Sequence, residues 1–170
     1  MAYTIKSGAV LSPYLRRQAQ ALADRLPFDI VITSGNRNVR QQAQAMFGKI
    51  ELGEDLVDTY RNDDMAQAVQ DTYPDLDAAV AVLEEHPGAS KHMQNRALDV
   101  RTYDRTTAQV NQMVQAADSM GWFYLVEAQP AHLHLGLPAE SGSTAGGKKN
   151  NGPGLGAVVI AGAALWILMR

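Results

Sequence analysis

The chain has 170 residues, of which 46% are hydrophobic and 19% are charged, and its formal net charge is −3. This length suits one domain of ordinary size with its own core, and the composition is that of a globular protein. The small negative charge gives no reason to expect nucleic acid as a partner. Because the chain has no cysteine, disulfides, thiolate ligands and a cysteine nucleophile are excluded, and any metal must be held by histidine and carboxylate.

Helix and strand patterns follow one another in the first half of the chain. A Ser-Pro pair opens a predicted helix over residues 12–26. The run "FDIVIT" at 28–33 predicts a buried strand that ends in Ser-Gly-Asn, and helical spacing resumes over residues 39–47.

An acidic segment follows, with eleven carboxylates and a single basic residue, Arg61, between Glu51 and Glu85. Such a run is typical of a solvated surface, and we expect a partly helical face with short helices at 64–73 and 75–86.

The second half of the chain predicts most of a sheet. Residues 97–101 read as a strand, residues 106–120 as a helix that stops at Gly121, and residues 122–127 and 131–137 as a hairpin. The fold class predicted from these elements is α+β, with a small antiparallel sheet flanked by helices.

The composition changes after Pro138. We expect a folded domain over 1–138, a flexible linker over 139–153 and a C-terminal membrane anchor over 154–170. The uncharged run from Leu155 to Met169 has fifteen residues, about 22 Å as a helix at ~1.5 Å per residue. This is slightly short for a transmembrane helix, and a core helix docked on the domain is the alternative. The N-terminus lacks the pattern of a cleaved signal peptide.

The chemically informative residues fall in two segments. In "AHLHLGL", His132 and His134 point to one face of a strand while the leucines point to the other, which argues against two core histidines. In the other segment His92 and Asp99 are seven positions apart. A set of two histidines and one aspartate leaves one position of a tetrahedral zinc ion open, as a catalytic zinc requires.

Three motifs together resemble a family. The segment "SKHMQNRALDV" at 90–100, "HLH" at 132–134 and "SGNRNVRQQ" at 34–42 are similar to those of zinc peptidases that include D-Ala-D-Ala carboxypeptidases and dipeptidases, phage endolysin peptidases and the Hedgehog signalling domain. The resemblance implies zinc ligands and substrate-binding residues at particular positions. The implied ligands are His92, Asp99 and His134, and Arg37 would bind a carboxylate or carbonyl of a peptide.

Ser90 is the second expected substrate-binding residue, and it would hold a ligand in place from beside the site or would be an ordinary turn serine. Two positions depart from the family pattern. Asn95 stands where the family usually has glycine, and asparagine tolerates the left-handed conformation. Ala131 stands where the peptidases commonly have the catalytic glutamate. We therefore expect Glu127 to act as the general base and His132 to stabilise the developing negative charge, with the reverse assignment open.

The resemblance implies a zinc metallopeptidase that hydrolyses peptide bonds of bacterial peptidoglycan. With a C-terminal anchor in a host or virion membrane, it suits a phage-encoded lysin or a virion-associated hydrolase. One alternative is a catalytically silent, Hedgehog-like zinc module that binds a partner. Another is a structural membrane component. Carboxypeptidase and endopeptidase action both stay open. Four basic residues form either a positively charged rim of the expected cleft or an ordinary solvated edge. They are Lys91, Arg96, Arg101 and Arg105.

Overall fold

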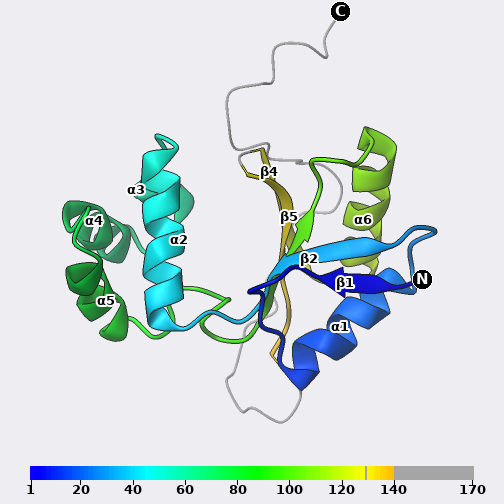
Figure 1. Cartoon of the computed structure of the whole chain (residues 1–170), viewed down its shortest axis with the longest axis horizontal. Helices are drawn as coiled ribbons and strands as arrows, with labels where there is room; N and C mark the ends of the chain where they lie inside the picture. The colour runs from blue at the N-terminus through cyan, green and yellow to red at the C-terminus, as the bar shows by residue number, and fades with distance from the viewer. Residues whose placement is uncertain (129, 140–170) are drawn as a thin grey trace, which may run out of the picture.

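The computed structural model describes residues 1–128 and 130–139. It is an α+β structure with one five-stranded sheet in the order β1-β2-β3-β5-β4 (Figure 1). The strands are β1 (Tyr3–Ile5), β2 (Ile30–Ser34), β3 (Ala97–Arg101), β4 (Phe123–Ala128) and β5 (Ala131–Gly136). The helices are α1 (Pro13–Ala23), α2 (Val39–Glu51), α3 (Leu56–Thr59), α4 (Asp63–Asp71), α5 (Leu76–Glu84) and α6 (Thr107–Ser119).

The sheet is mixed, which corrects the antiparallel sheet expected from the sequence. The pairs β2–β3, β3–β5 and β4–β5 are antiparallel, but β1 runs parallel to β2. Strand β1 was not predicted, because its three residues are too few to establish an alternating pattern. The other four strands and the β4–β5 hairpin are confirmed.

Local capping explains where the longer helices begin. The Ser12 side chain accepts a hydrogen bond from the backbone of the first turn of α1. Asn38 with Gln41, and Thr106 with Gln109, form capping boxes at the starts of α2 and α6. These caps satisfy backbone N–H groups that have no partner within the helix. The helix predicted at 39–47 continues to residue 51.

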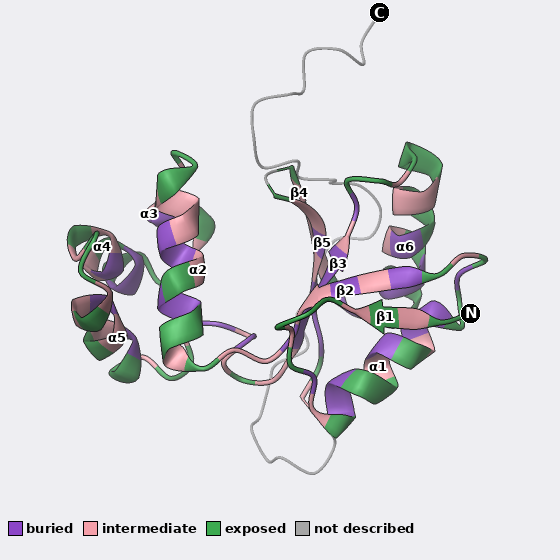
Figure 2. Cartoon of the chain, in the orientation of Figure 1, coloured by how far each residue is buried: buried purple, intermediate pink, exposed green. Residues whose placement is uncertain are grey.

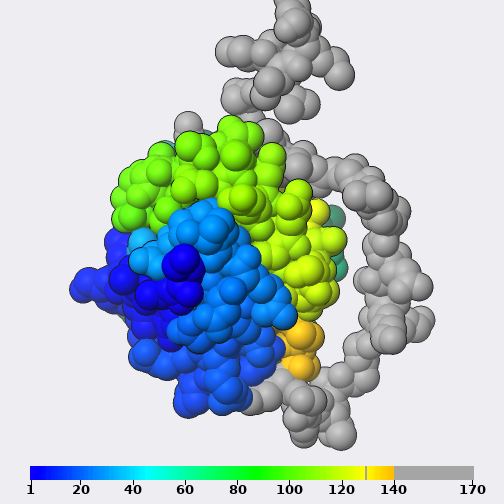
Figure 3. All heavy atoms as spheres, turned by 90° about the vertical axis from the view of Figure 1, so that its right-hand side faces the viewer, coloured from blue at the N-terminus to red at the C-terminus, as the bar shows by residue number. Residues whose placement is uncertain are grey.

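Two helices cover one face of the sheet. The apolar side chains of α1 and α6 pack on those of β2, β3 and β5 in one core cluster. Figure 3 views the molecule from this side, where blue N-terminal residues and green residues around α6 form a continuous surface. The opposite face of the sheet is therefore the one left for chemistry.

Helices α2 to α5 form a second lobe with its own core. Figure 2 shows buried residues in two groups, one around the sheet and one among these helices. Most carboxylates of the acidic segment are exposed, as expected, but the same segment buries Leu56, Met65, Val69 and Leu83. The segment is thus a helical lobe rather than only a solvated face, and it contains α3, which the sequence analysis did not predict.

The predicted linker and anchor fall almost wholly outside the described residues, which end at residue 139. Within the described ranges, no helix combines the length and apolar character needed to cross a membrane.

Candidate metal centre

Strand register places four polar side chains on the free face of the sheet. Asp99 on β3 pairs with His134 on β5, and Glu127 on β4 pairs with His132 on β5. Directly paired residues of antiparallel strands point to the same face. Leu133 and Leu135 alternate with the histidines and are buried in the core below. The alternation predicted from "AHLHLGL" is therefore confirmed.

His92 enters the site from the loop between α5 and β3. Its backbone N–H donates to the Ser90 hydroxyl at 3.2 Å, and its backbone carbonyl accepts from the Arg37 N–H at 3.3 Å. Asn95 has a φ of 57°, the left-handed conformation expected where glycine is usual in the family. Gly35, in the loop after β2, has no room for a Cβ against Leu11 and the Val10 carbonyl. These local features bring two distant motifs together.

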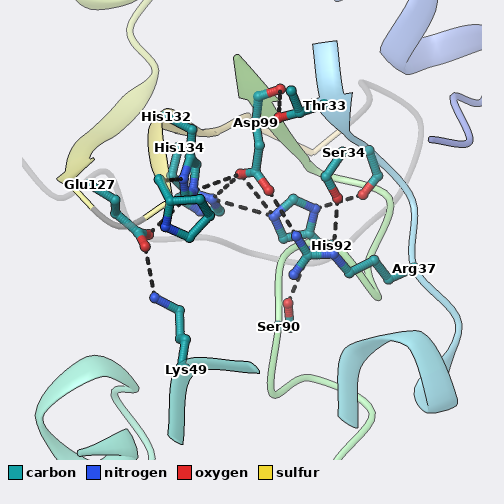
Figure 4. A network of polar contacts seen from close by, with 12 residues as sticks. Thr33, Ser34, Arg37, Lys49, Ser90, His92, Asp99, Glu127, His132 and His134 are labelled. Carbon is teal, nitrogen blue, oxygen red and sulfur yellow. Dashed lines mark hydrogen bonds and ion pairs between the residues drawn. The ribbon is translucent and has the colours of Figure 1, made fainter. Parts of the chain in front are cut away.

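Three side chains converge closely enough to hold one metal ion, namely His92, Asp99 and His134 (Figure 4). His92 Nε2 lies 3.3 Å from both His134 Nδ1 and Asp99 Oδ1, and His134 Nδ1 lies 2.8 Å from Asp99 Oδ1. A tetrahedral zinc with ligands at ~2.0–2.1 Å requires about 3.3 Å between ligand atoms. Two of the three distances match this value and the third is shorter. The donor set therefore fits one face of a tetrahedron.

Hydrogen bonds orient the first of these histidines for metal binding. His92 Nδ1 lies 2.6 Å from the Gly35 carbonyl oxygen, which can only accept a hydrogen bond. Nδ1 therefore carries the proton, and the lone pair of Nε2 faces His134 and Asp99. A backbone carbonyl on the second ring nitrogen is the usual support for a metal-binding histidine.

The charges of the cluster also suit a metal. Burial lowers the pKa of His92 and outweighs the opposing effect of Asp99, so the imidazole is neutral near pH 7. Burial alone favours a neutral Asp99, but His92 and His134 hold the pKa of this carboxyl well below its usual range. Neutral histidine and ionised aspartate are the protonation states that bind metal.

The cluster opens into a cleft of about 900 Å³ between the sheet and the helical lobe. Arg37, predicted to bind substrate, lines this cleft and donates to Asp99 Oδ2 at 2.8 Å and to the Ser34 hydroxyl at 2.9 Å. This contact leaves Asp99 Oδ1 to face the histidines. Ser90, the other predicted substrate-binding residue, is buried and caps the turn before His92.

Glu127 and His132, the two predicted catalytic residues, also line the cleft. His132 Nε2 lies 3.7 Å from Asp99 Oδ1 and 3.6 Å from Glu127 Oε1. His132 Nδ1 donates to the Pro130 carbonyl at 2.6 Å, so Nε2 is the ring nitrogen that faces Asp99 and Glu127 in the cleft. The structure thus places both residues next to the candidate metal ligands.

Lys49 is one residue of this site that was not predicted from the sequence. It reaches from α2 to Glu127 Oε2 at 2.7 Å and also binds Glu54 at 3.0 Å. Burial alone lowers the pKa of Lys49, but its hydrogen bonds and charge pairing with Glu127 and Glu54 outweigh this and raise it. Lys49 is 78 positions from Glu127 along the chain, so no local pattern connects the two.

The helical lobe contributes two further polar residues to the cleft wall that the sequence analysis did not single out. Gln42 on α2 donates to the Tyr60 hydroxyl at 3.2 Å and accepts from Arg37 at 3.4 Å. Burial raises the pKa of Tyr60. The site is thus built from both lobes.

Comparisons of the chain with protein-family models, with curated proteins and with solved structures found no match.

Proposed function

We propose that the chain is a zinc-dependent peptidase that cleaves peptides of bacterial peptidoglycan. The convergence of His92 Nε2, Asp99 Oδ1 and His134 Nδ1 beside a large cleft carries the metal part of this proposal. The ordered motifs around Arg37, His92 and His134 support the substrate class, through their resemblance to peptidases that act on cell-wall peptides.

His92, Asp99 and His134 would hold the zinc, and the cleft would admit a peptide. When bound, zinc supplies Lewis acidity that promotes the ionisation of water and polarises a carbonyl. Arg37 keeps Asp99 in place by a charged hydrogen bond. Arg37 is also 21% exposed at its side chain, which leaves part of the guanidinium accessible to a substrate oxygen.

His132 is the better proton acceptor of the two predicted catalytic residues. Its Nε2 faces the cleft and accepts no hydrogen bond from a described residue, whereas one oxygen of Glu127 already accepts a hydrogen bond from the Lys49 ammonium at 2.7 Å. We therefore favour the reverse of the first assignment. His132 accepts the proton at Nε2, and Glu127 stabilises the resulting imidazolium.

One contact favours a second candidate function, a zinc-bound module that binds a partner without catalysis. The Lys49–Glu127 ion pair occupies the only carboxylate near His132 besides Asp99 among the described residues. A binding module needs no free base, so this arrangement is compatible with it.

The test uses the full chain, loaded with zinc or stripped by a chelator, on purified peptidoglycan of several chemotypes. We expect zinc-dependent release of peptides. His132→Ala should lower kcat by about 100-fold or more, the usual contribution of a general base, and Glu127→Gln should lower it less. Glu84→Gln, on the exposed end of α5, is the control for a change of one surface carboxylate.

Three outcomes would change the assignment. If Glu127→Gln lowers kcat more than His132→Ala does, Glu127 is the general base. A tightly bound zinc without peptide release from any wall type favours the binding module, and a protein that binds no zinc contradicts both functions.

A further inference from the structure

An exposed aromatic ring lies in the same cleft, flanked by two cations. Phe123, the first residue of β4, is 45% exposed and lines the cleft. Lys91 Nζ is 4.7 Å from the centre of its ring and Arg61 Cζ is 5.9 Å from it. The three residues come from separate segments: β4, the loop before β3, and the loop between α3 and α4.

The two cations form no ion pair with an acidic residue of the described part of the chain. Among the residues that the structure describes, no carboxylate forms an ion pair with Lys91 or Arg61. The other cations of the cleft are paired, Arg37 with Asp99 and Lys49 with Glu127. Among the described residues, the Arg37 and Lys49 cations at the metal end of the cleft are therefore paired with carboxylates, whereas the two cations beside Phe123 form no ion pair.

The backbone makes room for this arrangement. Gly136 on β5 pairs directly with Phe123, and a Cβ at position 136 would overlap the Lys91 ammonium and lie 2.8 Å from its Cδ. The missing side chain allows the half-buried Lys91 to lie against the sheet beside the ring. Lys91 is thereby held at the cleft wall instead of extending into solvent.

The position of the ring relates it to the metal centre. Gly136 is two residues beyond His134 on the same face of β5, a distance of about 7 Å at ~3.3 Å per residue. An extended peptide advances by a similar amount per residue. A peptide bond at the metal centre therefore places a neighbouring residue of the same substrate close to Phe123.

We propose that Lys91 and Arg61, which both lie beside the Phe123 ring, form a subsite for a carboxylate of the substrate peptide, one or two residues from the bond that is cleaved. This proposal rests on the proposed peptidase function. The ring supplies an apolar surface for the substrate residue that carries the carboxylate, and the ammonium and guanidinium groups bind its charge. The carboxylate is either the free C-terminus, as in a carboxypeptidase substrate, or a free carboxyl group that branches from the peptide, such as the α-carboxyl of a γ-linked glutamate.

The test compares four forms of the pentapeptide L-Ala-γ-D-Glu-L-Lys-D-Ala-D-Ala with the zinc-loaded full chain. The C-terminus is free or amidated, and the γ-linked glutamate carries a free or amidated α-carboxyl group. We expect kcat/KM to fall about tenfold or more on amidation of one of these carboxyls, the usual effect of losing a charged hydrogen bond. The sensitive position identifies the source of the carboxylate.

The variants Lys91→Gln and Arg61→Gln should abolish most of this preference by raising KM for the charged peptide, with kcat nearly unchanged. Arg61→Glu should reverse the preference towards the amidated peptide. Arg16→Gln, an exposed arginine of α1 on the far side of the sheet, is the control and should change nothing.

Equal cleavage of all four peptides, or a preference that survives in every variant, overturns the subsite. If no peptide is cleaved, the peptidase function fails, and calorimetric dissociation constants of the same peptides then judge the subsite alone. The subsite is supported if the charged peptide binds more tightly than the amidated one and the two glutamine variants remove this difference. Equal binding of charged and amidated peptides rejects the subsite.

Discussion

At the scale of single residues, the candidate metal centre depends on which atom each ligand presents. His92 Nδ1 carries the ring proton because it donates to the Gly35 carbonyl, and Asp99 Oδ2 accepts a hydrogen bond from Arg37. Each residue is thus left with one atom, His92 Nε2 or Asp99 Oδ1, that faces the shared position. Such preorientation reduces the entropy lost when a metal binds.

Asp99 is the residue whose loss we expect to affect metal binding most, because it carries the only negative charge of the three ligands. Asp99→Asn should weaken zinc binding by more than about 100-fold. Loss of a residue that only supports a ligand weakens metal binding by about 100-fold at most, so a larger effect indicates that Asp99 is itself a ligand. The measurement is competition for zinc with a chromogenic chelator. Asp118→Asn, exposed on α6, is the matched control. Unchanged zinc affinity in Asp99→Asn would exclude Asp99 as a ligand.

At the scale of elements, alternation along β3 and β5 separates the core from the chemistry. Leu98 and Val100 on β3 are buried in the sheet core, while Asp99 between them lies on the cleft face. A shift of one residue in the strand register would move the polar side chains into the core. The burial of the leucines and valine therefore also keeps the site residues facing the cleft.

The loop that carries His92 into the site depends on the left-handed backbone at Asn95. Asn95→Ala should lower the free energy of unfolding by about 1 kcal/mol, because asparagine adopts this left-handed backbone conformation more readily than alanine does. Asn95→Gly should retain more stability than Asn95→Ala, since glycine has no Cβ. Urea unfolding of the three proteins measures this. An alanine variant as stable as the glycine variant would contradict the argument.

At the scale of the whole molecule, the site lies where two lobes meet. The sheet lobe supplies the metal cluster, Glu127 and His132, and the helical lobe supplies Lys49, whose ion pair with Glu127 crosses the cleft. The side chains of this pair are 17% and 11% exposed. Water therefore screens the pair less than a surface ion pair.

The cross-cleft pair predicts a pH dependence of stability. The pKa of Lys49 is raised on folding, so its contribution is complete below the unfolded pKa of about 10.4 and is lost as pH rises through the folded pKa. Lys49→Met should cost about 3 kcal/mol at pH 8, as for a buried ion pair that loses one partner. The cost should be smaller at pH 11.

Urea unfolding of the wild type and Lys49→Met at both pH values checks this prediction. Lys6→Met replaces an exposed lysine and should have little effect at either pH. An equal cost of Lys49→Met at pH 8 and pH 11 would show that the lysine acts through packing of its alkyl chain rather than through its charge.

The local sequence was sufficient to predict most helices and strands and the types of residue that form the candidate site. Alternation predicted the cleft-facing histidines of β5, and the Ser-Gly-x-Arg, His92–Asp99 and His-x-His motifs indicated the residues that the fold brings together. Asparagine at position 95 was read correctly as a left-handed residue. These features depend on neighbours within a few positions, where backbone geometry and side-chain chemistry decide the outcome.

The tertiary structure alone decided the remaining features. The parallel pairing of β1, the separate core of the helical lobe, the Lys49–Glu127 contact and the cations around Phe123 each join segments far apart in the chain. No periodicity records such contacts, because the packing of whole elements determines which distant side chains meet. The sequence by itself determined that His132 and His134 face the cleft from β5, because side chains alternate along a strand, and the packing of the two lobes decided which partners they meet there.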